Sequence, residues 1–220
     1  MPKHFERELE RLKRSLLTLA AKVEERLRMA TKAIETRDGN LADLVIDADH
    51  EIDEMEVDIE EECLKVLALH QPVAIDLRFI IAVIKINNDL ERIGDLAVNI
   101  AERAAFLASQ RKLDILFDFP GMAEKAQSMV KRSLDALVNM DNKLAWEVCA
   151  SDDEVDAMNR EMFIQVQNSM RKNISRMECL IHLLSASRHL ERIADHATNI
   201  AQDVVYMIEG EIVRHKAEHY

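Results

Sequence analysis

Two short stretches of the sequence carry the same candidate metal ligands. Residues 90–101 read LERIGDLAVNIA and residues 190–201 read LERIADHATNIA, and they are identical at nine of twelve positions. Each copy keeps a glutamate, an aspartate and an asparagine at four-residue steps: Glu91, Asp95 and Asn99, then Glu191, Asp195 and Asn199. Carboxylate and amide oxygens are the ligands that hard cations prefer. The repeat therefore indicates two related cation sites.

The repeated polar residues and the repeated apolar residues lie on different faces of a helix. Since each helical residue advances by about 100°, Glu91, Asp95 and Asn99 form one stripe, while Ile93 and Ile100 fall near the opposite side. Packing explains why the apolar residues repeat. A solvated acidic face, the simplest alternative, has no packing reason to repeat, so the agreement favours binding of a metal or a partner.

A second pair of acids precedes each motif on the neighbouring predicted helix. Antiparallel packing brings these acids opposite the motif, and four carboxylates repel one another unless water or a cation separates them. The first predicted site comprises Asp49, Asp53, Glu91 and Asp95. The second comprises Asp152, Asp156, Glu191 and Asp195, and Asn99 and Asn199 are further candidates. The donors favour magnesium, calcium, manganese or iron, with zinc as a further candidate.

Other reactive side chains are weaker candidates. His189 and His196 flank the second motif, but Asp89 and Leu96 stand at these places in the first, so a symmetric histidine ligand is not expected. Arg92 and its repeat are best read as partners of a nearby acid on the same helix. The sequence has no Gly-rich phosphate loop, no HExxH and no nucleophile motif. No catalytic residue is predicted, and the chain is not expected to be an enzyme.

The composition predicts an all-α protein, since Gly and Pro are scarce and helix-forming residues are abundant. Breaks at Gly39, at Pro72 and around Pro120 and Gly121, with two further turns near Asp141 and Asn173, leave six helical segments: about 4–37, 41–70, 73–108, 120–139, 142–171 and 175–209. Similarity between the halves then predicts two tandem three-helix bundles, over residues 1–112 and 113–220. The small residues Gly94 and Ala194 within the repeats suggest close approach of a neighbouring helix.

The charge and the cysteines narrow the partners and the compartment. The formal charge of −12 disfavours nucleic acid and anionic lipid surfaces as partners. The charged amino terminus is neither a secretory signal nor a transmembrane span, so membrane insertion is not expected. Three isolated cysteines are typical of reduced thiols in the cytoplasm. Within the fold, we expect them to be small core or boundary side chains.

With these motifs in hand, the chain resembles the PhoU family of phosphate-uptake regulators. The doubled LERI-x-D motif and the turn QPVAIDLR, with Gln71, Pro72, Asp76, Leu77 and Arg78, look like signatures of that family. The resemblance covers essentially the whole chain. It implies two pseudo-symmetric three-helix bundles and metal binding through the paired acids named above. It also implies a cytoplasmic protein, often a homodimer, that connects the phosphate ABC transporter with a sensor histidine kinase.

That role implies a negative regulator of phosphate uptake and of the phosphate-starvation response, with the ATPase subunit of the transporter as one partner. Two alternatives remain open: a ferritin-like di-metal enzyme, and a helical scaffold without metal. The second half lacks the Pro turn and the DLR triplet, so a role of Asp76 or Arg78 is not expected to be mirrored there. The two metal sites are accordingly expected to differ.

Overall fold

The computed structural model describes residues 3–111, 118–172 and 174–212. All regular elements in these ranges are helices: α1 (Lys3–Thr36), α2 (Gly39–Asp47), α3 (Asp49–His70), α4 (Ala74–Ser109), α5 (Phe119–Asn139), α6 (Asn142–Ala150), α7 (Asp152–Lys172), the 3₁₀ turn η1 (Ile174–Arg176) and α8 (Met177–Glu209). The predicted all-α class with six long helical segments is confirmed. None of the described helices is both long and apolar enough to cross a bilayer.

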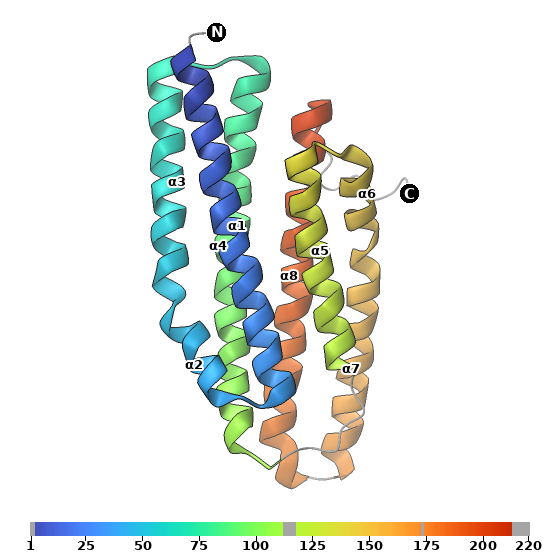
Figure 1. The fold of residues 1–220 in the computed structure, drawn as a ribbon. Coiled ribbons are helices and arrows are strands. Elements are labelled where there is room, and N and C mark those ends of the chain that lie inside the picture. Colours follow the sequence, from blue (N-terminus) through green and yellow to red (C-terminus); the bar gives the residue numbers. More distant parts are fainter. Residues whose placement is uncertain (1–2, 112–117, 173, 213–220) are drawn as a thin grey trace.

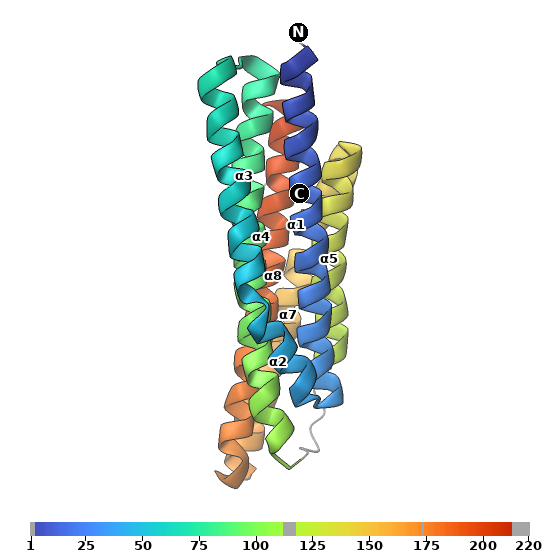
Figure 2. The ribbon, with the colours of Figure 1, turned by 60° about the vertical axis from the view of Figure 1, so that its left-hand side comes forward.

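The helices form two bundles that lie side by side (Figures 1 and 2). Helices α1, α3 and α4, with the short α2, make the first, and α5, α7 and α8, with α6, make the second. The long helices α4 and α8 lie together at the centre, and α1 also contacts α5. A single hydrophobic core runs through both halves, and the expected core residues Ile86, Ile93 and Ile100 are fully buried in it.

Matching turns start the second element of each half. Arg37 and Met140 take the left-handed conformation that ends a helix, with φ of 55° and 50°. The side chains of Asp38 and Asp141 then accept backbone N–H groups three residues on, at 3.1 and 3.0 Å. The predicted helix stop at Gly39 is therefore wrong in detail, because the left-handed residue is Arg37 and Gly39 opens α2.

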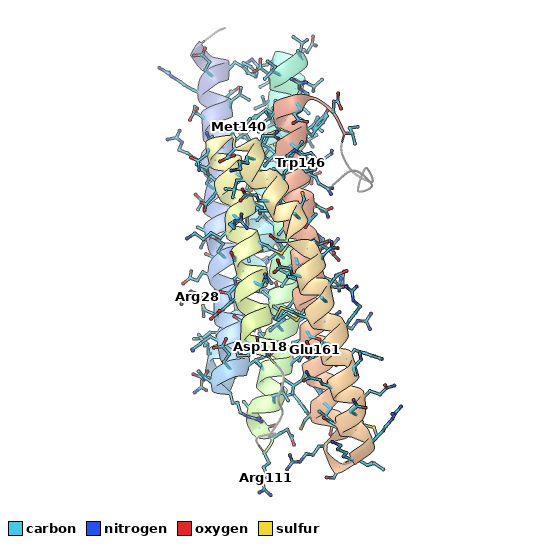
Figure 3. The ribbon with its side chains drawn as sticks, turned by 90° about the vertical axis from the view of Figure 1, so that its right-hand side faces the viewer. Arg28, Arg111, Asp118, Met140, Trp146 and Glu161 are labelled. Atoms are coloured by element: carbon cyan, nitrogen blue, oxygen red, sulfur yellow. The ribbon has the colours of Figure 1, made fainter. Side chains whose placement is uncertain are left out.

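The two breaks predicted at Pro72 and Pro120 are found at these prolines. Helix α3 ends at His70 and α4 begins at Ala74, on either side of Pro72. In α5, Pro120 lies in the first turn and the Asp118 side chain accepts the N–H of Gly121. Figure 3 shows Asp118 at the start of α5, and Met140 at its end beside α6, the helix of Trp146.

The predicted turn at Asn173 and the boundary between residues 112 and 113 fall outside the described residues.

Two predicted helices are interrupted. The segments 41–70 and 142–171 were expected to be continuous, but Ala48 and Ser151 leave the regular helical path and split each into a short and a long helix. Neither position is Gly or Pro, so the sequence carried no breaker signal. The interruptions make Asp49 and Asp152 the first residues of α3 and α7.

A contact between α4 and α8 joins the two halves at the carboxyl end of α8. Gly210 ends α8 with φ of 77°, and the Arg78 guanidinium of α4 lies directly against it. The positive φ favours glycine at residue 210, whereas a side chain there would only have to displace the flexible end of Arg78. Arg78 of the QPVAIDLR turn therefore lies at the junction of the halves. The second half has no counterpart of this turn.

Candidate metal centres

The interruptions at Ala48 and Ser151 put acids at helix amino termini. Asp49 and Glu51 lie in the first turn of α3, and Asp152, Asp153 and Glu154 lie in the first turn of α7. Free backbone N–H groups and the helix dipole stabilise negative charge at such positions. The local fold thus positions one partner acid of each predicted site and partly offsets the repulsion that the site creates.

The first acidic patch, which we define as Asp49, Asp53, Glu91 and Asp95, takes its residues from α3 and α4, and three of its four carboxylates form a close cluster. One carboxylate oxygen from each of Asp49, Asp53 and Asp95 lies within 4.8 Å of the other two. Partial burial, then the charges of Asp53 and Asp95, raise the pKa of Asp49. Burial, and then Asp95, likewise raise the pKa of Glu91. Such a cluster resists full ionisation, which is what a bound cation would relieve.

Arginine balances only part of this charge. Arg92 Nε lies 3.3 Å from Glu91 Oε2, and Arg92 Nη1 lies 3.3 Å from Asp95 Oδ2. The prediction that this arginine pairs with acids of its own helix is confirmed. Glu91 Oε2 is nevertheless buried and accepts no hydrogen bond of good geometry, from Arg92 or from another described residue. A buried oxygen in that state, within an all-oxygen donor set, fits a hard cation and would serve as a ligand.

Sequence comparison of the two halves missed one member of the first patch. Glu56, one turn after Asp53 on α3, has a raised pKa because of partial burial, then Glu60 and Asp53. The fully buried Asn87 of α4 donates its amide to the Glu56 backbone oxygen at 2.9 Å and to its carboxylate at 3.2 Å. The three-residue spacing from Asp53 was a usable signal, but Glu56 has no acidic counterpart in the second half.

The second acidic patch, defined as Asp152, Asp156, Glu191 and Asp195, is electrostatically coupled in the same way. Loss of solvent, then Asp152, Glu191 and Asp156, raise the pKa of Asp195 to about 6. Loss of solvent and then Asp156 raise the pKa of Asp152. Within the described residues, however, no three carboxylates of this patch approach as closely as those of the first. The second patch is therefore the looser one, in line with the expected difference between the sites.

The position of Glu56 explains part of this difference. Its counterpart, 103 residues on, is Asn159, and the counterpart of Asn87 is Ser187. The Ser187 hydroxyl donates to Asn159 Oδ1 at 3.0 Å, so the link between the helices is kept while the charge is removed. The first patch with its neighbour holds five carboxylates, and the second has a neutral amide at the fifth position.

The two candidate asparagines have other hydrogen bonds. Asn99 donates its amide to the Asp95 backbone oxygen at 2.8 Å, one turn back on the same helix. Asn199 donates to Asp89 Oδ1 at 3.3 Å, across the junction of the halves. His196 joins that junction, with Nδ1 2.8 Å from Asp89 Oδ1. Both asparagine amides are thus used in other hydrogen bonds, and the acids remain the candidate ligands. The contact with Asp89 gives His196 a role between the halves that the sequence did not reveal.

The close helix approach predicted at Gly94 is confirmed. A Cβ atom there would lie 3.1 Å from Cδ1 and 3.2 Å from Cγ2 of Ile52 on α3. In the second half the corresponding residues are Ala194 and Val155, both buried, so a larger residue on one helix is matched by a smaller one on the other. This contact sets the spacing of α3 and α4 directly beside the first acidic patch.

Comparison with known proteins covers nearly the whole chain. The family model for the PhoU domain matches twice, over residues 16–104 and 119–204. A "Phosphate-specific transport system accessory protein PhoU homolog" of Clostridium acetobutylicum is 38% identical over 96% of this chain and 97% of its own length. The protein of the same name from Aquifex aeolicus is 40% identical, over 96% of this chain and 95% of its own.

Solved structures agree. The crystal structure of PhoU from Pseudomonas aeruginosa matches with a TM-score of 0.92 at 36% identity, over 94% of this chain and all of the other. The phosphate transport system regulatory protein PhoU from Streptococcus pneumoniae matches with a TM-score of 0.81 at 30% identity, over 95% and 99% of the two chains. The resemblance seen in the motifs is thereby confirmed: this chain belongs to the PhoU family.

Proposed function

We propose that this chain is a cytoplasmic regulator without catalytic activity that connects the phosphate ABC transporter with a sensor histidine kinase. It would restrain phosphate uptake and hold phosphate-starvation genes off when phosphate is plentiful. The observation that carries the proposal is the match of both halves to the PhoU domain, together with relatives named as accessory proteins of the phosphate-specific transport system. The family resemblance further suggests that the regulator acts as a homodimer.

The two acidic patches give the regulator its proposed metal sites. Asp49, Asp53, Glu91 and Asp95 would hold one ion or cluster and the corresponding acids of the second patch another. A bound cation supplies positive charge that neutralises the carboxylates. The raised pKa values of Asp49 and Glu91 support this role, because partial burial and then neighbouring carboxylates both disfavour the charged forms that a cation would stabilise. Neutralisation would fix α3 against α4 and so hold the helix faces that partners contact.

Exposed apolar side chains offer surfaces for the two partners. Leu69, Val73 and Ile75, at the turn between α3 and α4, are each about two-thirds or more exposed. Ile174 is exposed in η1, at the turn between α7 and α8 and at the opposite end of the molecule (Figure 1), and Phe163 is exposed further back on α7. Clusters of exposed apolar surface are typical of protein interaction sites. Two such ends suit an adaptor that binds two proteins.

Co-purification tests the adaptor role. The tagged chain would be recovered from phosphate-replete and phosphate-starved cells whose own family member has been deleted, and its partners identified by mass spectrometry. We expect the transporter ATPase and a histidine kinase, in amounts that change with phosphate supply, and repression of starvation genes restored in replete cells. A Val73→Asp/Ile75→Asp variant should lose a partner, whereas Leu44→Asp, at an exposed residue of α2, serves as the matched control. Recovery of neither partner in either condition would contradict the proposal.

A further inference from the structure

A cluster of different composition lies at the end of the first bundle, away from both acidic patches. It comprises His4 and Glu8, one turn apart on α1, and His70, the last residue of α3. Helix α1 has 34 residues and its counterpart α5 has 21, so the amino-terminal turns of α1 have no equivalent in the second half. Comparison of the repeats therefore could not reveal this cluster.

The three side chains converge closely. His4 Nδ1 lies 2.9 Å from Glu8 Oε1, and His70 Nε2 lies 2.5 Å from Glu8 Oε2. One ligand atom from each residue lies within 4.8 Å of the other two. Ligands 2.0–2.1 Å from a tetrahedral zinc ion are separated by about 3.3 Å. A small adjustment, chiefly of the exposed His4 side chain, would bring this cluster to that geometry.

The contact between Glu8 and His70 is buried. Glu8 Oε2 and His70 Nε2 face each other at ion-pair distance without the geometry of a hydrogen bond, and neither atom has a hydrogen-bond partner elsewhere among the described residues. A shared cation would satisfy both buried atoms. The His70 ring is held by Phe5, whose ring centroid lies 5.0 Å away and whose side chain is buried. The fold thus fixes an imidazole nitrogen and a carboxylate oxygen side by side, as two ligands of one ion are fixed.

From this geometry we propose that His4, Glu8 and His70 form a zinc site that joins the start of α1 to the end of α3. Two imidazole nitrogens with one carboxylate suit zinc, whereas the oxygen-only acidic patches suit harder cations. A water molecule would complete a tetrahedral set. The inference stands on these three residues alone and does not depend on the proposed regulatory function.

Cobalt substitution tests the site on the full-length chain. The protein is stripped with a chelator and titrated with Co²⁺, whose absorption is strong in four-coordinate sites with nitrogen ligands and weak in six-coordinate oxygen sites. Zinc is then added to displace it. We expect a strong visible band that saturates at one cobalt per chain and disappears on addition of zinc.

Matched variants locate the signal. His4→Gln, at an exposed position that leaves the fold unchanged by circular dichroism, should weaken cobalt and zinc affinity by about tenfold or more, at least the scale seen when outer-shell partners are lost. His70→Gln should do the same. His50→Gln is the control, because His50 and Glu54 form a similar exposed pair, 3.1 Å apart, without a third ligand. Asp95→Asn/Asp195→Asn should also retain the band.

The proposal is overturned if wild type shows no four-coordinate cobalt band. It is equally overturned if His4→Gln and His70→Gln keep the band unchanged, or if the acidic-patch variant or His50→Gln removes it.

Discussion

Asp195 shows what the acidic patches cost at the level of a single residue. Burial and neighbouring carboxylates raise its pKa to about 6, whereas unfolded aspartates titrate near 4. The native state therefore binds this proton more tightly than the unfolded chain. It follows that metal-free protein gains stability as pH falls from about 6 towards 4, and loses that contribution as pH rises through 6.

We accordingly predict that Asp195→Asn stabilises the metal-free protein at pH 7 by about 1 kcal/mol, well under the unscreened value because the Asp195 side chain, although partly desolvated, still contacts solvent. The gain should shrink towards pH 5. Urea unfolding of both proteins across this range measures it. The pH dependence of wild type alone does not isolate the contribution of Asp195. Burial and then Arg103 lower the pKa of His189 to about 4, so His189 makes the native state less stable as pH falls. A gain that stays constant with pH would contradict the assignment.

Glu56 distinguishes the two patches and gives a reciprocal prediction. Glu56→Asn should lower divalent-cation affinity at the first patch by about tenfold, because ligand charge tunes such sites. Asn159→Glu should raise affinity at the second. Calorimetric titration of each variant measures both effects, and Glu60→Asn, one turn further from the patch, is the control. Equal affinities in all four proteins would show that this position has no part in metal binding.

At the scale of elements, the sequence predicted the helices well and their interruptions poorly. The breaks at Pro72 and Pro120 were predictable, because proline limits its own backbone conformation and that of the preceding residue. The interruption at Ser151 had a weaker signal in the S-x-x-E pattern with Glu154, which is typical of a helix start. Ala48 had no comparable signal. Continuous apolar periodicity across both points concealed them, since the core faces of the paired helices stay in register.

The capping aspartates give a prediction for each half. Asp38→Ala and Asp141→Ala remove equivalent side-chain caps and should each cost about 1 kcal/mol of unfolding free energy. Asp43→Ala, on the exposed surface of α2, should cost little. Denaturant unfolding measures the three changes. If Asp43→Ala cost as much as the caps, the capping account of these turns would be wrong.

The contact between α3 and α4 is tested by a double-mutant cycle. Gly94→Ala adds a methyl group 3.1 Å from Ile52, and we expect the overpacking, typically 1–3 kcal/mol, to exceed a helix-propensity gain of up to about 1 kcal/mol. Ile52→Val removes Cδ1, the nearer of the two close atoms, and leaves Cγ2. The double variant should therefore be more stable than the sum of its single changes by about 1 kcal/mol. Strict additivity in urea unfolding would mean that this contact does not set the helix spacing.

On the scale of the whole molecule, the two halves share one hydrophobic core. Helices α4 and α8 lie together at the centre, and Asp89 with His196 and Lys85 with Asp203 link them at 2.8 and 3.2 Å. We predict one cooperative unfolding transition. Trp146, the single tryptophan, reports on the second half and circular dichroism on both. The two signals should coincide in urea, and a separate tryptophan transition would contradict this prediction.

The internal repeat made most of the site predictable. Agreement at Glu91 and Glu191, and at the acids around them, marked positions that packing does not explain. The same method could not find features that the halves do not share. Glu56 and Arg78 fall in this class, as does the link from Asp89 to His196. Tertiary packing between the halves decides the contacts of Arg78 and Asp89, and residue spacing within one half carries no record of them. Glu56 differs, because its three-residue spacing from Asp53 was a usable signal within its own half.

The central claim is that the repeated acids bind metal, and elemental analysis after chelation and reloading tests it most directly. Wild type and a variant with Glu91→Ala, Asp95→Ala, Glu191→Ala and Asp195→Ala would be loaded with iron, manganese or magnesium, desalted and measured for metal per chain. The account predicts metal in wild type and its loss, apart from any zinc-type site at His70, in the variant. Equal metal content in the two proteins would contradict it.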